Sequence, residues 1–157
     1  MILSNLHSVR KLENSEAIPY QILLLADETK EAIDRYIFDA EIFVLEKFDE
    51  IIALYALKAI NSNQIEIKNI AVKEDFQGKG IGTFLLNDAF IRAKNLGFHS
   101  LLIGTGDASI KQLALYQREG FKKYEVIKDF FIDNYPEVIY ENGIQLKDMI
   151  VLEKKIM

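Results

Sequence analysis

The chain has 157 residues, half of them hydrophobic and 27% charged, which matches the size and composition of one globular domain with a sizeable core. Its formal net charge of −5 disfavours a nucleic-acid-binding protein, which needs a basic surface to meet phosphates. The absence of cysteine from the sequence excludes disulfides, thiolate metal sites and cysteine nucleophiles.

The first part of the chain predicts a short strand, a helical region and a three-stranded meander. Two apolar, β-prone runs are separated by Asp49-Glu50, which is typical of an antiparallel hairpin, and a third run follows after a short polar break. The predicted elements are a strand at 6–12, one or two helices at 15–40, and strands at 41–48, 51–60 and 64–72.

The second part of the chain alternates strands with helices. After a glycine-rich stretch, apolar residues recur at spacings of three and four from Phe84 to Leu96, which predicts an amphipathic helix that ends at Gly97. A second helix ends at Gly120. With the meander, this order indicates an α/β domain with a mixed sheet. The further elements are strands at 99–106, 121–127 and 147–156, a helix at 108–119 and a longer connection at 128–144.

Several features bound the class of protein further. No apolar run reaches the length of a membrane span, and the first residues lack the apolar core of a secretory signal. His7 and His99 are isolated from other metal-ligating residues. We therefore expect a single domain over residues 1–157 that is cytoplasmic, binds no metal, and has neither membrane nor nucleic acid as a partner.

The stretch "QGKGIGT" places three glycines and Lys79 immediately before the first long helix. A P-loop would need Ser or Thr directly after the lysine, where Gly80 stands, and a dinucleotide fingerprint would need glycine where Thr83 or Leu85 stands. What remains is Q-x-x-G-x-G, formed by Gln77, Gly80 and Gly82. With the downstream stretch "LALYQREGF", which matches an L-Y-x-x-x-G-F element, the sequence resembles the GNAT superfamily of acetyl-CoA-dependent N-acetyltransferases.

The resemblance is strongest from residue 65 to residue 121, and it also implies a fold and a binding site for the coenzyme. The fold is a mixed, mostly antiparallel sheet of six to seven strands, flanked by about four helices, with a V-shaped split between the fourth and fifth strands. A helix start presents unpaired N–H groups and partial positive charge, which suit a pyrophosphate, although a glycine-rich turn can also merely begin a helix. The implied coenzyme-binding residues are Ala71, Val72, Gln77, Gly78, Lys79, Gly80, Ile81, Gly82 and Thr83.

Two residues are the catalytic candidates. Tyr116 falls where the family places a tyrosine that protonates the departing thiolate of the coenzyme. The helix pattern alone favours a core residue, and the distance downstream of Gln77–Gly82 is what favours the catalytic role. Glu66 falls where several relatives place a general base, although an alternating strand would also put it on a solvated face with Lys68.

The sequence departs from the family where many relatives carry an asparagine at the start of the second helix. Ser109 stands there, with Asp107 just before it, and we predict that both contact the coenzyme, while an N-cap role is the alternative for either. In the connection, Phe130, Phe131, Tyr135 and Tyr140 favour packing in the core or in a dimer over an acceptor pocket. The acidic run of Asp133, Glu137 and Glu141 reads as a solvated loop or as an attractor for a cationic acceptor.

The resemblance implies an N-acetyltransferase that transfers an acetyl group from acetyl-CoA to a primary amine, of a small molecule or a peptide, by direct attack in a ternary complex. Since the chain has no cysteine, an acyl-cysteine intermediate is excluded. The alternative is a non-catalytic acyl-CoA sensor or interaction domain on the same fold, because a fold does not fix a function. We also expect a homodimer.

Overall fold

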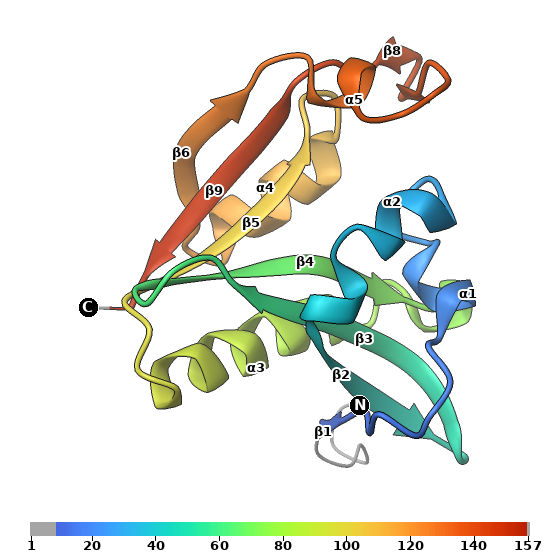
Figure 1. Cartoon of the computed structure of the whole chain (residues 1–157), viewed down its shortest axis with the longest axis vertical. Helices are drawn as coiled ribbons and strands as arrows, with labels where there is room; N and C mark the ends of the chain where they lie inside the picture. Colours follow the sequence, from blue (N-terminus) through green and yellow to red (C-terminus); the bar gives the residue numbers. More distant parts are fainter. Residues whose placement is uncertain (1–8, 157) are drawn as a thin grey trace.

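The computed structural model describes residues 9–156 and has the mixed α/β architecture that the sequence predicts (Figure 1). Its main sheet has the strand order β1-β2-β3-β4-β5-β9-β6, and only β4 and β5 pair in parallel. The strands are β1 (Arg10–Lys11), β2 (Glu41–Lys47), β3 (Glu50–Ala59), β4 (Gln64–Val72), β5 (Ser100–Gly106), β6 (Lys122–Ile127) and β9 (Met149–Lys155).

Most predicted elements are confirmed, and the differences are small. Residues 6–8 of the predicted first strand lie outside the described residues, and the strand is assigned at Arg10–Lys11. The helical region divides into α1 (Tyr20–Leu23), α2 (Lys30–Asp34) and a 3₁₀ turn, η2 (Ile37–Asp39). The predicted connection at 128–144 contains a helix, α5 (Phe130–Asp133), and one strand of a small second sheet, β7 (Tyr140–Glu141), which pairs with β8 (Ile144–Gln145).

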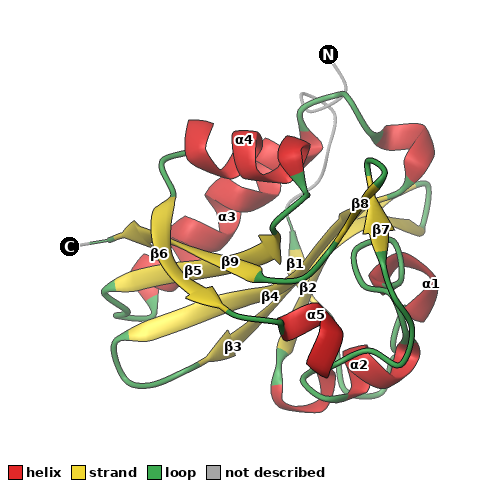
Figure 2. Ribbon diagram, turned by 90° about the horizontal axis from the view of Figure 1, so that it is seen from above, coloured by secondary structure: helices red, strands yellow, loops and turns green. Residues whose placement is uncertain are grey.

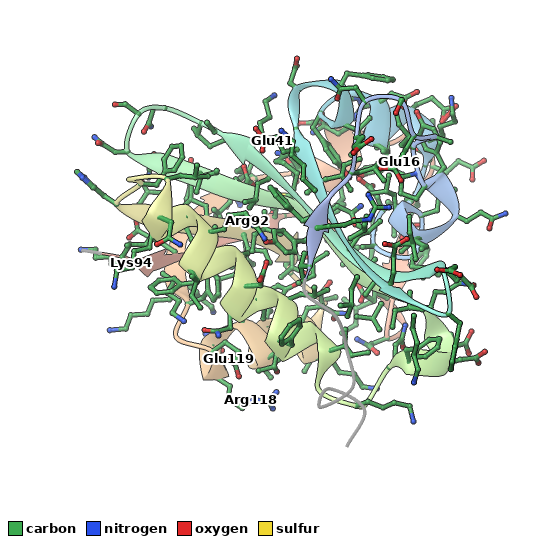
Figure 3. The ribbon with its side chains drawn as sticks, turned by 90° about the horizontal axis from the view of Figure 1, so that it is seen from below. Glu16, Glu41, Arg92, Lys94, Arg118 and Glu119 are labelled. Carbon is green, nitrogen blue, oxygen red and sulfur yellow. The ribbon has the colours of Figure 1, made fainter. Side chains whose placement is uncertain are left out.

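The two longest helices of the described residues cover one face of the sheet. These are α3 (Ile81–Asn95) and α4 (Ile110–Arg118), while α1 and α2 lie against the opposite face (Figure 2). Arg92 lies on the side of α3 that faces the sheet, where its Nε donates to the Tyr55 hydroxyl at 3.0 Å (Figure 3). No helix in residues 9–156 is long and apolar enough to cross a membrane.

The sheet opens between β4 and β5. These strands pair only from Gln64 with Ser100 to Ile67 with Ile103, and beyond that point they diverge like the arms of a V (Figure 1). The predicted split between the fourth and fifth strands is therefore present.

A β-bulge lies in β4 where the two strands separate. β3 pairs Leu57 with Ile67 and Ala56 with Asn69, so Lys68 is an extra residue. An extra residue exchanges the two faces of a strand. Before it the odd-numbered Ile65 and Ile67 contact the core under α3, and after it Ile70 and Val72 do so. The bulge therefore turns Asn69 and Ala71 toward α1 and α2 at the opening of the V.

Candidate active site in the cleft between strands β4 and β5

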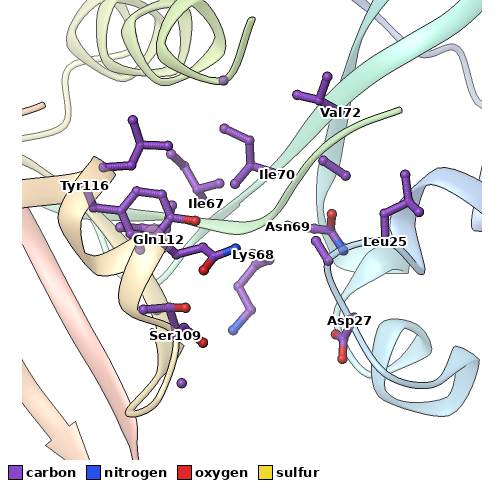
Figure 4. A pocket seen from close by; sticks show the side chains of 18 of the residues that line it. Leu25, Asp27, Ile67, Lys68, Asn69, Ile70, Val72, Ser109, Gln112 and Tyr116 are labelled. Carbon is purple, nitrogen blue, oxygen red and sulfur yellow. The ribbon is translucent and has the colours of Figure 1, made fainter. Parts of the chain in front are cut away.

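The opening of the V forms a cleft of about 900 Å³. Its walls come from β4, the start of α3, the end of β5 and α4 (Figure 4). It is bordered by the loop after α1 and by the segment from α5 to β9. The cleft therefore brings together elements from both halves of the chain.

The glycine-rich turn forms one end of the cleft and begins α3. Gly78 and Gly80 have positive φ angles of 73° and 86°, which only glycine adopts without strain, and Gly80 is the N-cap residue of the helix. The backbone N–H of Phe84 donates to the Gly80 carbonyl at 3.0 Å and makes the first bond of the helix. The N–H groups before it are those that a helix start leaves unpaired, and they lie at a cleft wall.

Most of the sequence-predicted coenzyme residues line this cleft. Gln77 also holds the turn against the bulged strand, because its side-chain amide donates to the Val72 carbonyl at 2.9 Å. Lys79 is exposed and is not part of the lining, whereas Arg118, which the sequence did not single out, is a lining residue at the end of α4 (Figure 3). The predicted residues that line the cleft are Ala71, Val72, Gln77, Gly78, Gly80, Ile81, Gly82, Thr83, Ser109 and Tyr116.

Tyr116 is buried on α4, and its hydroxyl points into the cleft (Figure 4). The ring packs beside Phe121, with ring centroids 6.2 Å apart, and the Phe121 N–H donates to the Tyr116 carbonyl at 2.9 Å. Burial, assisted by the negative charge of Glu141, raises the pKa of the Tyr116 phenol from about 10 to about 12. The hydroxyl therefore stays protonated at neutral pH and can donate a proton inside the cleft.

The two candidates around the start of α4 have different surroundings. The carboxylate of Asp107 accepts the backbone N–H groups of Lys147 and Asp148 at 3.1 and 3.2 Å, which fixes the segment before β9, and Asp107 does not line the cleft. Ser109 is the N-cap residue of α4, but its side chain makes no capping bond. Its hydroxyl instead donates to Oε2 of Glu141 at 2.6 Å, inside the cleft.

Glu66 lies on β4 before the bulge. Its carboxylate is 3.4 Å from the ammonium of Lys68, and its side chain is largely covered. Lys68 lines the cleft and also lies over the ring of Tyr36, whereas Glu66 is not one of the lining residues. A catalytic role for Glu66 stays a prediction.

A hydrogen-bond network crosses the mouth of the cleft. The Asn69 amide donates to the Tyr36 hydroxyl at 3.0 Å, Tyr36 donates to Asp27 at 3.1 Å, and Tyr135 donates to the same carboxylate at 2.6 Å. Burial raises the pKa of both phenols, so both remain donors at neutral pH. Asp27 thus connects the loop after α1 with the segment after α5.

Asn69, Asp27 and Tyr135 of this network all line the cleft, and among the described residues Asn69 differs from the other two in having a free acceptor. It is buried, and within residues 9–156 its Oδ1 atom accepts no hydrogen bond, which leaves an acceptor for an N–H group of a ligand. Its position as a polar residue directly before the apolar run "IAV" is the one sequence signal that points to it. Asp27 has no such signal, because its contact with Tyr135 joins residues 108 positions apart in the sequence.

Comparisons with known proteins show the family to which this chain belongs. Residues 6–121 match the model of the acetyltransferase (GNAT) family. An uncharacterized N-acetyltransferase of Bacillus subtilis, YvbK, is 45% identical over 133 residues, which are 85% of this chain and 86% of that protein.

Two solved structures have closely similar folds. A GNAT family acetyltransferase from Elizabethkingia anophelis with acetyl-CoA bound is 46% identical, with a TM-score of 0.92 over 95% of this chain and 97% of the other. A Bacillus subtilis acetyltransferase in complex with CoA is 40% identical, with a TM-score of 0.89 over 98% and 100% of the two chains. The chain therefore belongs to the GNAT family of acetyltransferases.

Proposed function

We propose that the protein transfers an acetyl group from acetyl-CoA to a primary amine, in a small molecule or a peptide, by direct attack within a ternary complex. The observation that carries this proposal is that one cleft contains both the unpaired start of α3 and the hydroxyl of Tyr116. Two similar proteins were crystallised with acetyl-CoA or CoA, which supports the same ligand in this cleft.

The residues of the cleft suggest how the coenzyme is held. The N–H groups from Gly78 to Thr83 receive the pyrophosphate, and Lys79 adds positive charge from the solvent side. The pantetheine arm lies along β4 from Asn69 to Val72, where β5 no longer pairs with that strand. Ser109 contributes to the wall on the side of α4.

The chemistry follows from this arrangement. The amine nitrogen attacks the thioester carbon, a bond forms between nitrogen and carbon, and the bond between carbon and sulfur breaks. A backbone N–H of β4 polarises the thioester carbonyl, and Tyr116 gives its proton to the sulfur as the thiolate leaves. The amine loses one proton to a base, for which Glu66 is the sequence-based candidate. Homodimer formation and a cytoplasmic location also stay predictions.

The experiment that tests this function follows the release of free thiol from acetyl-CoA. Polyamines, aminoglycosides and peptides with a free N-terminus serve as acceptors, and calorimetry measures CoA binding on the same material. We expect CoA binding together with amine-dependent thiol release and an acetylated product that mass spectrometry detects. Binding of CoA without turnover on any amine would refute the proposed acceptor class.

A further inference from the structure

Glu141 is a carboxylate in the cleft whose surroundings differ from those of its acidic neighbours. Asp133 and Glu137 are exposed and do not line the cleft, whereas Glu141 is half-buried on β7 and does. The hydroxyl of Ser109, which is itself only 4% exposed, donates to Oε2 of Glu141 at 2.6 Å. Within residues 9–156 the second oxygen, Oε1, accepts no hydrogen bond. Glu141 is therefore fixed through one oxygen and available through the other.

The carboxylate also acts on the catalytic tyrosine. Its negative charge adds to burial in raising the pKa of Tyr116, so the carboxylate lies close enough to the phenol to affect its protonation. A proton donor for the leaving group and a proton acceptor thus border the same space, on α4 and β7.

The other ionisable groups of the cleft are less suited to accept a proton there. Asp27 already accepts hydrogen bonds from the hydroxyls of Tyr36 and Tyr135. Glu28 is exposed at the rim, Lys68 carries positive charge and pairs with Glu66, and Arg118 lies at the far end of α4. Of the described carboxylates that line the cleft, Glu141 is the one whose Oε2 is held by a hydrogen bond while its Oε1 accepts none. Its charge also raises the pKa of the Tyr116 phenol.

We propose that Glu141 is the catalytic base of this site, an inference that rests on the proposed transfer to an amine. Oε1 takes one proton from the acceptor ammonium, so that the neutral nitrogen can attack the thioester. Tyr116 gives its proton to the departing sulfur, and the nitrogen, which becomes positively charged on attack, loses a second proton. Of the two protons that the nitrogen gives up, one restores the Tyr116 hydroxyl and the other leaves to solvent, which frees Glu141 again. The sum is one ammonium and one thioester converted to one amide, one thiol and one proton. Ser109 is a positioning residue that holds the carboxylate in place.

The test uses two acceptors of nearly equal shape that differ in protonation. Ethylamine is protonated at neutral pH and must lose a proton before it can attack, whereas methoxyamine is already neutral and can attack directly. Glu141→Gln keeps the size of the side chain and an oxygen that accepts from Ser109. We expect kcat/KM for ethylamine to fall about 100-fold, the order of one acid–base contribution, while methoxyamine changes by less than about threefold. Raising the pH toward the pKa of ethylamine should shrink the deficit.

Three comparisons make each outcome decisive. Glu137→Gln, on an exposed residue of the same segment, should leave both rates unchanged, and CoA affinity should be equal in both variants and the wild type. Two results in Glu141→Gln would overturn the assignment of Glu141 while leaving acetyl transfer intact: an equal loss of rate for both amines, or no loss for either. The assignment would also fail if Glu66→Gln, and not Glu141→Gln, lost rate with ethylamine only. CoA binding without wild-type turnover on either probe or on any amine of the panel would refute the proposed function, and the assignment with it.

Discussion

At the scale of single residues, the properties of Tyr116 follow from its two neighbours. Phe121 packs against the ring and keeps it buried, and the charge of Glu141 further disfavours the phenolate. Both effects act in the same direction, because burial and a nearby negative charge each favour the neutral form of a phenol. The phenol of Tyr116 therefore stays protonated well above neutral pH, and it loses its proton only near its pKa of about 12.

Tyr116→Phe should separate catalysis from binding. The ring stays packed against Phe121 and only the hydroxyl is lost, so the fold and the CoA affinity should be unchanged. Loss of a general acid costs about 10²–10⁴ in rate, and we expect kcat to fall within that range. Thiol release and calorimetry on the same preparation check this, and wild-type kcat in the variant would show that Tyr116 only packs the core.

In the wild type, no alkaline loss of kcat below about pH 10 should come from this residue, because its pKa is raised to about 12.

At the scale of elements, the site depends on two local departures from regular structure. One is the left-handed backbone at Gly78 and Gly80, which lets α3 begin directly at the cleft wall. The other is the bulge at Lys68, which lies where β4 and β5 stop pairing. Each departure can be removed separately by mutation.

Gly80→Glu should abolish CoA binding, because the new side chain would fill the approach to the helix start and repel a phosphate. Gly97→Glu is the matched control, since Gly97 lies just beyond the other end of α3, has a similar φ of 89° and has nothing within 4 Å of an added Cβ. Both variants should lose about 1–2 kcal/mol of stability from backbone strain. Calorimetry should detect CoA binding in Gly97→Glu and none in Gly80→Glu; equal affinities would place the pyrophosphate elsewhere.

Deleting Lys68 should give a folded protein that does not bind CoA. Without the extra residue, Ile65, Ile67, Ile70 and Val72 still alternate onto the face under α3, so the core can be kept. The strand would lose its bulge, however, and could continue pairing with β5 across the coenzyme site. Lys68→Ala keeps the bulge and is the control, with wild-type CoA affinity expected. Circular dichroism and calorimetry check the two variants, and undiminished binding after the deletion would show that the bulge is not needed for the cleft.

At the scale of the whole molecule, the sequence predicts features that lie within a short stretch of the chain, and it does not predict contacts between residues that are distant in the sequence. The meander, the start of α3 and Tyr116 are predictable because turn residues, apolar spacing and a motif lie within short stretches. The surroundings of Asp107 are not predictable in this way, because its carboxylate accepts hydrogen bonds from backbone N–H groups some 40 residues later. The approach of Glu141 to Ser109 likewise depends on how the segment after β6 returns across the cleft. The bulge at Lys68 is marked in the sequence only by two consecutive polar residues, Lys68 and Asn69, which shift the apolar alternation of the strand from odd-numbered to even-numbered positions.

The last prediction concerns the stability of the whole fold, which CoA should increase because its site joins both arms of the V. A ligand that binds only the folded protein at 100 times its dissociation constant adds about 2.7 kcal/mol. For a chain of this length, 1 kcal/mol corresponds to about 2–4 °C in Tm, so we expect a rise of about 5–10 °C. Thermal unfolding with and without CoA measures it. CoA should raise the Tm of Tyr116→Phe and of Glu141→Gln by the same amount as that of the wild type. It should not raise the Tm of Gly80→Glu. A smaller shift in Glu141→Gln would mean that this carboxylate supports coenzyme binding rather than proton transfer alone.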